Sequence, residues 1–290
     1  MIKIAGVVIA YFPDISKLIF NINTYIDHIE QLYIVYNSPL TTDEIIKLQS
    51  TSSKVQLIIN QENAGIASSL NQTAQKALSL GYEWLLTMDQ DSCFQNDDYF
   101  KAFGRSNFIN VAIFCPTSDS SLEFNINNIN ETTEDLNVIT SGNLLNLEIW
   151  KTLGGFEQKL FIDEVDNDYC LKANLKGFKI IRFINIPLVH ELGQNKEVIF
   201  FFKKYTIITH PPIRTYYIFR NNFYIFSKYK YLFPEFVKSR KIMLLKVFIK
   251  ILLFSENRIQ NCRYIYSGIK DYFHGSYGSY LSEKPKTIAE

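Results

Sequence analysis

Hydrophobic and polar positions alternate in blocks along the first ninety residues. Four short apolar runs predict strands buried on both faces of a sheet: Ile2–Tyr11, Leu32–Tyr36, Val55–Ile59 and Trp84–Met88. The segments between them carry apolar residues at helical spacing and predict helices at Ile15–His28, Thr42–Ser50 and Ile66–Leu80. Thr42 is a candidate cap for the second helix, and Gly81 is a suitable stop for the third. This alternation predicts an α/β fold with a parallel sheet covered by helices on both faces.

Polar residues follow each of these predicted strands. In a sheet of this type the carboxyl ends of the strands lie along one edge, and ligands bind beyond that edge. The residues placed there are Tyr11, Tyr36-Asn37-Ser38, Asn63-Ala64-Gly65 and Asp89-Gln90-Asp91. These four positions are therefore the first candidates for binding and catalytic residues.

The pattern is less regular beyond about residue 110. It predicts further strands at Ile139–Leu147 and Lys179–Leu188, and a helix at Asp163–Lys176 that stops before Gly177. From Tyr216 to His274 the pattern is mostly helical. The chain therefore divides into an α/β part and a helical C-terminal part.

Composition excludes several classes of protein. The 290 residues are 47% hydrophobic and 20% charged, which excludes wholesale disorder. Lys and Arg number 30 against 29 Asp and Glu, and this near balance excludes a generally basic nucleic-acid binder. The four cysteines form no Cys-x-x-Cys pair, so we expect reduced thiols and a cytoplasmic location.

The balanced charge conceals two opposite regions. Glu83–Asp168 holds 16 acidic and 4 basic residues, whereas Lys228–Tyr272 holds 10 basic and 3 acidic residues. Such asymmetry indicates two tasks. An acidic centre suits a divalent cation, and a basic, aromatic tail suits an anionic surface; an acidic excess also serves simply to solvate loops.

Asp89 and Asp91 stand directly after the fourth predicted strand. Two carboxylates at this spacing can face one hard cation, and Mg²⁺ or Mn²⁺ would leave positions free for substrate phosphates. An isolated Asp-x-Asp is a weak signal because turns are rich in aspartate. Its place at the sheet edge is what favours a metal site.

A second acidic cluster holds four carboxylates in six residues, from Asp163 to Asp168. Acidic residues in the first turn of a helix are stabilised by the helix dipole, which is a purely structural interpretation. The functional interpretation is a general base that takes the proton of an alcohol as a C–O bond forms. Both remain open at this point.

Three other features have comparable structural and functional interpretations. Gly154-Gly155 fits either an ordinary turn or a close approach of the backbone to a ligand. Arg214 and Arg220 could hold a phosphate or stack on the neighbouring tyrosines. His190 alone is more often a core or surface residue than a metal ligand.

The C-terminal part contains an amphipathic helix with a broad apolar face: Leu244, Leu245, Val247, Phe248, Ile251, Leu252 and Phe254. Lys246 and Lys250 mark the opposite side. A basic amphipathic helix can lie in a membrane interface, here the inner face of the cytoplasmic membrane. The alternative is a helix packed on the catalytic domain or on a dimer partner.

Taken in order, these motifs resemble family 2 inverting glycosyltransferases of the GT-A fold, most closely the bacterial rhamnosyltransferase-like branch. The matching pieces cover residues 1 to about 225: Val7-Val8-Ile9-Ala10-Tyr11, Asn63-Ala64-Gly65-Ile66-Ala67 with Asn71, Trp84 through Asp89-Gln90-Asp91-Ser92, Gly154-Gly155-Phe156, Phe161-Ile162-Asp163 through Leu171-Lys172, and His190-Glu191-Leu192-Gly193. The resemblance implies a GT-A (Rossmann-like) nucleotide-sugar-binding domain at residues 1–225 with a mostly parallel central sheet, and a helical extension at residues 226–290.

The resemblance also implies roles for individual residues. Asp166 would be the catalytic base, and Asp91, His190 and Asp89 would hold the Mg²⁺ or Mn²⁺ ion. The implied donor-binding residues are Ala10, Tyr11, Asn37, Asn63, Gly65, Asn71, Asp89, Gln90 and Arg220. The implied acceptor-side residues are Gly154, Gly155, Asp163 and Glu164.

The implied partners are a dTDP- or UDP-linked sugar donor, with a rhamnose-like deoxysugar favoured, and a saccharide or lipid-linked saccharide acceptor in cell-surface polysaccharide synthesis. Many relatives carry an Asp after the second strand where this chain has Tyr36-Asn37, which leaves the nucleotide base open. The competing interpretations are a metal-dependent nucleotidyltransferase and a non-catalytic nucleotide-sugar or glycan-binding module. The first would usually carry a Gly-rich basic loop after the first strand, where this chain has Phe12-Pro13-Asp14.

Overall fold

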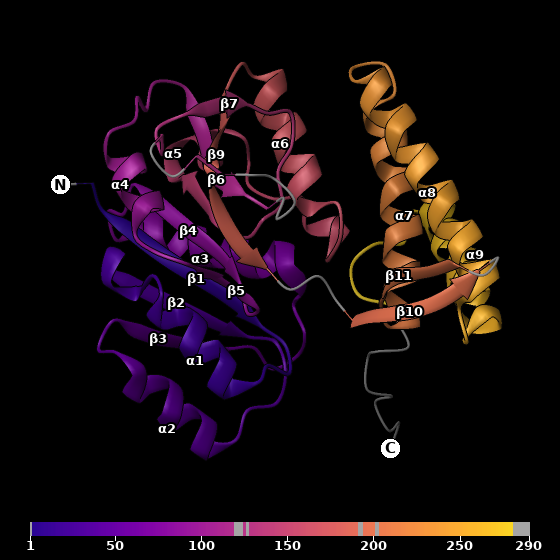
Figure 1. Ribbon diagram of the computed structural model, residues 1–290, viewed down its shortest axis with the longest axis horizontal. Coiled ribbons are helices and arrows are strands. Elements are labelled where there is room, and N and C mark those ends of the chain that lie inside the picture. Colours follow the sequence, from indigo (N-terminus) through magenta and orange to yellow (C-terminus); the bar gives the residue numbers. More distant parts are fainter. Residues whose placement is uncertain (1, 119–123, 126–127, 191–193, 201–202, 281–290) are drawn as a thin grey trace. The chain divides into compact units, whose positions relative to one another are not determined.

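The computed structural model describes residues 2–118, 124–125, 128–190, 194–200 and 203–280. Contacts divide the chain into two compact units (Figure 1). The first comprises residues 1–158 and 165–191, and the second comprises residues 159–164 and 192–290. The short segment 159–164 therefore belongs to the second unit although both of its neighbours in sequence belong to the first.

The first four strands form the predicted parallel sheet, in the order β3-β2-β1-β4. Their bounds are β1 (Ile4–Ala10), β2 (Gln31–Tyr36), β3 (Val55–Ile59) and β4 (Trp84–Asp89). The helices α1 (Ile15–Asn23), α2 (Thr42–Thr51) and α3 (Gly65–Ser79) connect them. Val8, Ile34 and Leu86 are fully buried, as expected for strands covered on both faces.

Two details of these helices differ from the prediction. The first predicted helix stops at Asn23, and a separate 3₁₀ turn follows at Ile26–His28. The second helix is capped by Thr41 rather than Thr42: the Thr41 hydroxyl accepts from the Glu44 backbone and the Glu44 carboxylate accepts from the Thr41 backbone. This reciprocal arrangement is a capping box, which satisfies two backbone donors at once.

The sheet continues beyond β4 in the order β8-β6-β9-β5, and β7 pairs with β9. The added strands are β5 (Ser92–Phe94), β6 (Val111–Thr117), β7 (Thr132–Glu134), β8 (Asn143–Asn146) and β9 (Lys179–His190). β8 runs antiparallel between β4 and β6. The predicted strand Ile139–Leu147 is therefore wrong in length, since only its second half pairs. Helices α4 (Asp98–Gly104) and α5 (Leu147–Thr152) complete this part.

The helix expected at Asp163–Lys176 begins later, as α6 (Val165–Leu175). Phe161, Asp163 and Glu164 have φ values of 64°, 62° and 65°, in the left-handed region that disfavours side chains with a Cβ. Asp163 and Glu164 therefore lie outside the first helical turn, and the helix-dipole interpretation does not apply to them. It applies to Asp166 and Asp168, which are in that turn.

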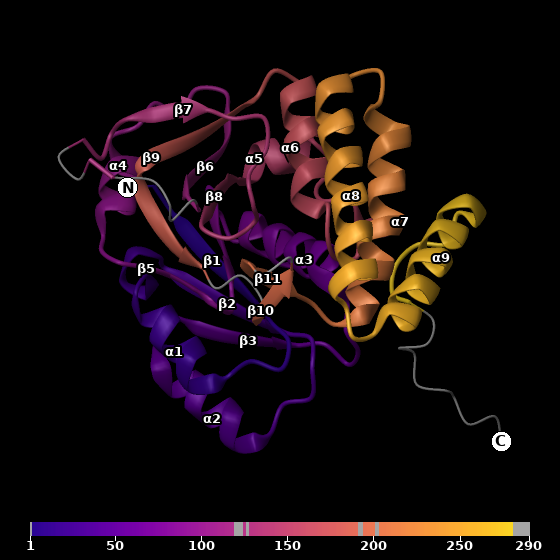
Figure 2. The same cartoon turned by 45° about the vertical axis from the view of Figure 1, so that its right-hand side comes forward.

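The second unit contains a two-stranded antiparallel ribbon, β10 (Gln194–Phe200) with β11 (Lys203–Thr209), followed by three helices. The helices are α7 (Pro212–Tyr229), α8 (Pro234–Phe254) and α9 (Arg258–His274) (Figure 2). Phe219, Leu244 and Ile265, one from each helix, form a buried cluster that holds them together. The predicted domain boundary at residue 225 falls inside α7. The division into a catalytic domain and a helical extension stays a prediction.

No helix in the described ranges combines the length and the apolar character needed to cross a membrane.

Candidate active site

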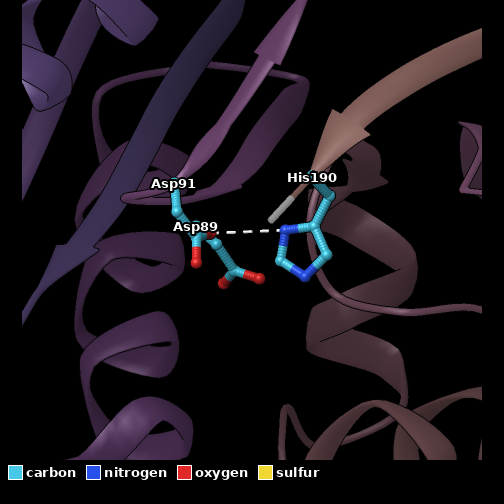
Figure 3. Close-up of side chains that lie close together, drawn as sticks. All are labelled: Asp89, Asp91 and His190. Atoms are coloured by element: carbon cyan, nitrogen blue, oxygen red, sulfur yellow. Dashed lines mark ion pairs between the residues drawn. The ribbon is translucent and has the colours of Figure 1, made fainter. Parts of the chain in front are cut away.

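Two carboxylates and a histidine gather at the carboxyl edge of the sheet. Asp89 ends β4, Asp91 precedes β5, and His190 ends β9. β5 pairs antiparallel with β9 so that Ser92 stands opposite His190, which brings the histidine next to Asp91. One ligand atom from each of Asp89, Asp91 and His190 lies within 4.8 Å of the others, and Figure 3 shows the three side chains converging.

Hydrogen bonds from neighbouring serines hold this group in place. Nδ1 of His190 lies 2.7 Å from the Ser92 hydroxyl and 3.3 Å from one Asp91 carboxylate oxygen. The backbone N–H of Asp89 donates to the Ser141 hydroxyl at 3.0 Å. Ser92 and Ser141 therefore orient the cluster. Ser92 was recognisable from the Asp-Gln-Asp-Ser motif, whereas no sequence signal pointed to Ser141.

The donor set fits a hard divalent cation. The Asp91 oxygen that faces His190 is buried and, within the described residues, accepts no hydrogen bond. A buried carboxylate oxygen without a donor is costly unless a cation or water satisfies it. Carboxylate oxygens suit Mg²⁺ and Mn²⁺. Residues 191–193, which follow His190 in the quoted motif, lie outside the described residues.

Gln90 connects the group of Asp89, Asp91 and His190 to the end of β1. Its side-chain oxygen accepts from the Tyr11 backbone N–H at 2.8 Å, and Asn21 donates to the Gln90 carbonyl at 3.0 Å. Ala10 is buried as the last residue of β1, whereas the Tyr11 side chain is 49% exposed. Gln90 thus positions Tyr11 by binding its backbone, and the Tyr11 ring stays accessible.

The residues near β2 and α3 that were expected to bind the nucleotide-sugar donor form a buried polar network. The Asn37 side chain donates to the Ser69 hydroxyl at 3.1 Å and accepts from Asn60 at 2.7 Å. Asn63 accepts from the Gly65 backbone at 2.9 Å, and Gly65 has a φ of 76°. These hydrogen bonds fix the conformation of the loop that leads into α3. Asn37 and Asn63 therefore have a structural role at this edge of the sheet.

Asn71 on α3 fixes the turn that contains Gly154 and Gly155. Its side-chain oxygen accepts from the Phe156 backbone at 2.8 Å, and its amide donates to the Phe156 carbonyl at 2.8 Å. A Cβ on Gly155 would lie 2.6 Å from that same oxygen. Lys172 of α6 also donates to the Gly155 carbonyl. The close approach of the glycine backbone therefore serves packing against Asn71 and Lys172.

Asp166 shares a small cavity with Thr87, which lies two residues before Asp89 on β4. Asp166 lines this cavity of about 10 Å³ together with Thr87 of β4, Asn143 of β8, and Tyr169 and Cys170 of α6. Thr87 and Asp89 are two residues apart on one strand, so their side chains share a face of the sheet about 7 Å apart. Burial raises the pKa of Tyr169 and of Cys170 well above their usual values, so these two groups stay neutral. Asp166 is the carboxyl group of this cavity.

Asp163, Glu164 and Arg220 belong to the second unit. Asp163 accepts two N–H groups of Arg214, the closer at 2.9 Å, and Glu164 pairs with Arg240. Arg220 is fully buried, donates to the Leu160 and Gly278 carbonyls, and lies over the Tyr216 and Tyr217 rings. A diphosphate contact by Arg220 would require these bonds to open.

Comparisons with known proteins extend this picture. No family model matches the chain. The dTDP-rhamnosyl transferase RfbF of Shigella flexneri is 28% identical over 245 residues, which cover 78% of this chain and 80% of the relative. The crystal structure of GalNAc-T7 with UDP, GalNAc and Mn²⁺ superposes with a TM-score of 0.53 at 14% identity; the match covers 66% of this chain and 44% of that longer one. S. aureus TarS matches with a TM-score of 0.49 at 16% identity, covering 94% of this chain and 44% of TarS. The predicted GT-A fold and the predicted resemblance to glycosyltransferases are confirmed.

Proposed function

We propose that this chain, a glycosyltransferase with the GT-A fold, transfers a rhamnose-like deoxysugar from a nucleotide diphosphate to a saccharide or lipid-linked saccharide during cell-surface polysaccharide synthesis. The similarity to a dTDP-rhamnosyl transferase favours dTDP as the carrier over UDP. The observation that carries the proposal is the convergence of Asp89, Asp91 and His190 at the sheet edge. Asp166 lines a cavity together with Thr87, which lies on the same strand as Asp89. We place the reaction in the cytoplasm, since all four cysteines are unpaired.

Asp89, Asp91 and His190 would hold a Mg²⁺ or Mn²⁺ ion. When bound, such a cation offsets the negative charge that develops on the departing diphosphate. The Tyr11 ring, exposed beside this cluster, is suited to stack on the nucleotide base. Asn37 is buried and bonded to Asn60 and Ser69, so it would act by fixing the loop next to the nucleotide base rather than by contacting the base directly.

Asp166 would take the proton of the acceptor hydroxyl while that oxygen attacks the anomeric carbon. Attack from the face opposite the diphosphate inverts the configuration in one displacement, through a transition state that resembles an oxocarbenium ion. General-base catalysis contributes typically about 10²–10⁴-fold in rate. The Gly154-Gly155 turn, pinned by Asn71 and Lys172, would border the acceptor side.

Replacing Asp166 with Asn tests this role. Turnover with dTDP-rhamnose and a saccharide acceptor should fall by about 10²–10⁴-fold, because the amide cannot accept the proton. Donor binding with Mn²⁺, measured by calorimetric titration, should stay within about two-fold of the wild type, since a single proton transfer in the transition state does not contribute to ground-state binding. Full transferase activity in Asp166→Asn would overturn the assignment of the base.

A panel of nucleotide sugars tests the donor. Thermal unfolding of the wild type with Mn²⁺ should shift upwards most with dTDP-linked deoxysugars, because a ligand that binds only the folded state stabilises it. Equal shifts with no turnover of any donor would instead assign the chain to the non-catalytic binding modules.

A further inference from the structure

Helix α8 carries two separate apolar stripes, and only one of them is buried. Leu244 is buried against Phe219 of α7 and Ile265 of α9, and Val247, Phe248 and Ile251 pack on the same cluster. This half of the apolar face predicted from the sequence therefore packs within the second unit, against α7 and α9. Lys250, expected on the open side, is partly buried, and burial lowers its pKa.

The second stripe, which we call the outer stripe, consists of Ile242, Leu245, Ile249, Leu252 and Leu253. These five side chains are 43–57% exposed. Their spacing of three, four, three and one residues places them on one side of the helix, over a length of about 16 Å. Scattered exposed leucines are ordinary, but a contiguous apolar row marks an interaction surface.

Lysines flank the outer stripe on both sides. At 100° per residue, Lys241 lies on one margin, Lys246 lies on the other, and Lys238 continues the line of the stripe towards the N-terminus. All three are exposed. The exposed acidic residues Glu235 and Glu256 lie beyond the two ends of the stripe. The surface therefore combines an apolar centre with basic margins.

We propose that the outer stripe docks on an anionic lipid membrane surface, with α8 lying in the plane of the interface. The leucines and isoleucines would enter the boundary of the acyl chains while the lysines, on flexible stems, reach the phosphate groups. A second copy of this chain fits less well, because the centres of protein interfaces favour aromatic residues and disfavour lysine. The outer stripe has no aromatic side chain and is bordered by three lysines.

Cosedimentation with vesicles tests the proposal. The wild type should bind vesicles of phosphatidylcholine and phosphatidylglycerol at low salt and bind pure phosphatidylcholine far less, because each lysine near an anionic surface adds attraction. High salt should weaken the binding by screening. The double variant Ile249→Ser/Leu252→Ser should lower the vesicle partition coefficient about twenty-fold. Lys241→Gln and Lys246→Gln should each lower it about five-fold.

A matched control exists on α2 of the first unit. Ile46 is 59% exposed, and its neighbour Lys47 is exposed as well. The double variant Ile46→Ser/Lys47→Gln makes the same kinds of change outside the outer stripe and should bind vesicles like the wild type. Donor hydrolysis in solution should be the same in all these variants, so a failure of the membrane proposal is distinguishable from a failure of the proposed function.

Four results would overturn the proposal. The first is a wild type that ignores anionic vesicles at low salt, and the second is equal binding by Ile249→Ser/Leu252→Ser. The third is a dimer in solution that this variant dissociates, which would assign the outer stripe to a second copy. The fourth is a melting temperature of Ile249→Ser/Leu252→Ser, measured without lipid, that falls as far as that of a variant in the buried core. Such a fall would show that the outer stripe packs within the chain.

Discussion

The two acidic clusters look alike in the sequence but have different partners in the structure. At the sheet edge, Asp91 pairs with His190 and gathers with Asp89. In the segment before α6, Asp163 and Glu164 pair with Arg214 and Arg240. A guanidinium is permanently charged and neutralises its carboxylate, whereas an imidazole can give up its proton and bind a cation alongside the carboxylates. The partner, rather than the density of acids, distinguishes a candidate metal site from a structural anchor.

The largest effect expected from this contrast is in Asp91→Asn. Metal-dependent binding of dTDP should fall by about 100-fold or more, because a proposed ligand of the cation loses its charge. Calorimetric titration with nucleotide and Mn²⁺ measures it. Asp163→Asn is the matched control and should bind the nucleotide like the wild type. Equal losses in both variants would contradict the distinction between the clusters.

The next effect is on stability, in Arg240→Met. Glu164 is 5% exposed, and removing Arg240 takes away the guanidinium that neutralises its buried carboxylate, while the Asn222 amide still donates to that carboxylate. We expect a loss of about 3 kcal/mol, near the lower end for broken buried pairs because the Arg240 side chain keeps 23% exposure. Chemical denaturation followed by circular dichroism measures it. The double variant Glu164→Gln/Arg240→Met should recover part of the loss; no recovery would show that the ion pair is not its cause.

The smallest effect is expected in Arg214→Met. Its side chain is 41% exposed, so water screens the pair with Asp163. The loss of stability should be about 1 kcal/mol or less. The same denaturation experiment ranks the two arginines, and a larger loss for Arg214 than for Arg240 would reverse the ranking by burial.

Much of the first half of the fold was predictable because its signals are local. Strands β1 to β4 are short apolar runs, and their parallel pairing was predicted from their alternation with helical segments. The capping box has a sequence signal, the spacing of Thr41 and Glu44, but the cap predicted from the sequence was Thr42. The resemblance named Asp89, Asp91 and His190 together, and the structure brings them together as a candidate metal-binding group. The contact between Ser92 and His190 that helps assemble this group joins residues 98 positions apart.

The remaining features depend on tertiary context. β6 includes Pro116, which is not typical of a central strand, and β8 is only four residues long. The late start of α6 follows from left-handed backbone at Asp163 and Glu164, where the sequence has no glycine to signal it. Arg220 gave no sign of burial, because the carbonyls that receive its N–H groups lie about sixty residues away.

The segment 159–164 has a consequence for how the protein is made. The Leu160 carbonyl is held by Arg220 and Asn221, 60 and 61 positions later in the chain. At typical ribosomal speeds, those side chains emerge roughly 3–12 s after the carbonyl they bind. The residues preceding Asp166 therefore gain these contacts only after all the strands of the sheet have been synthesised.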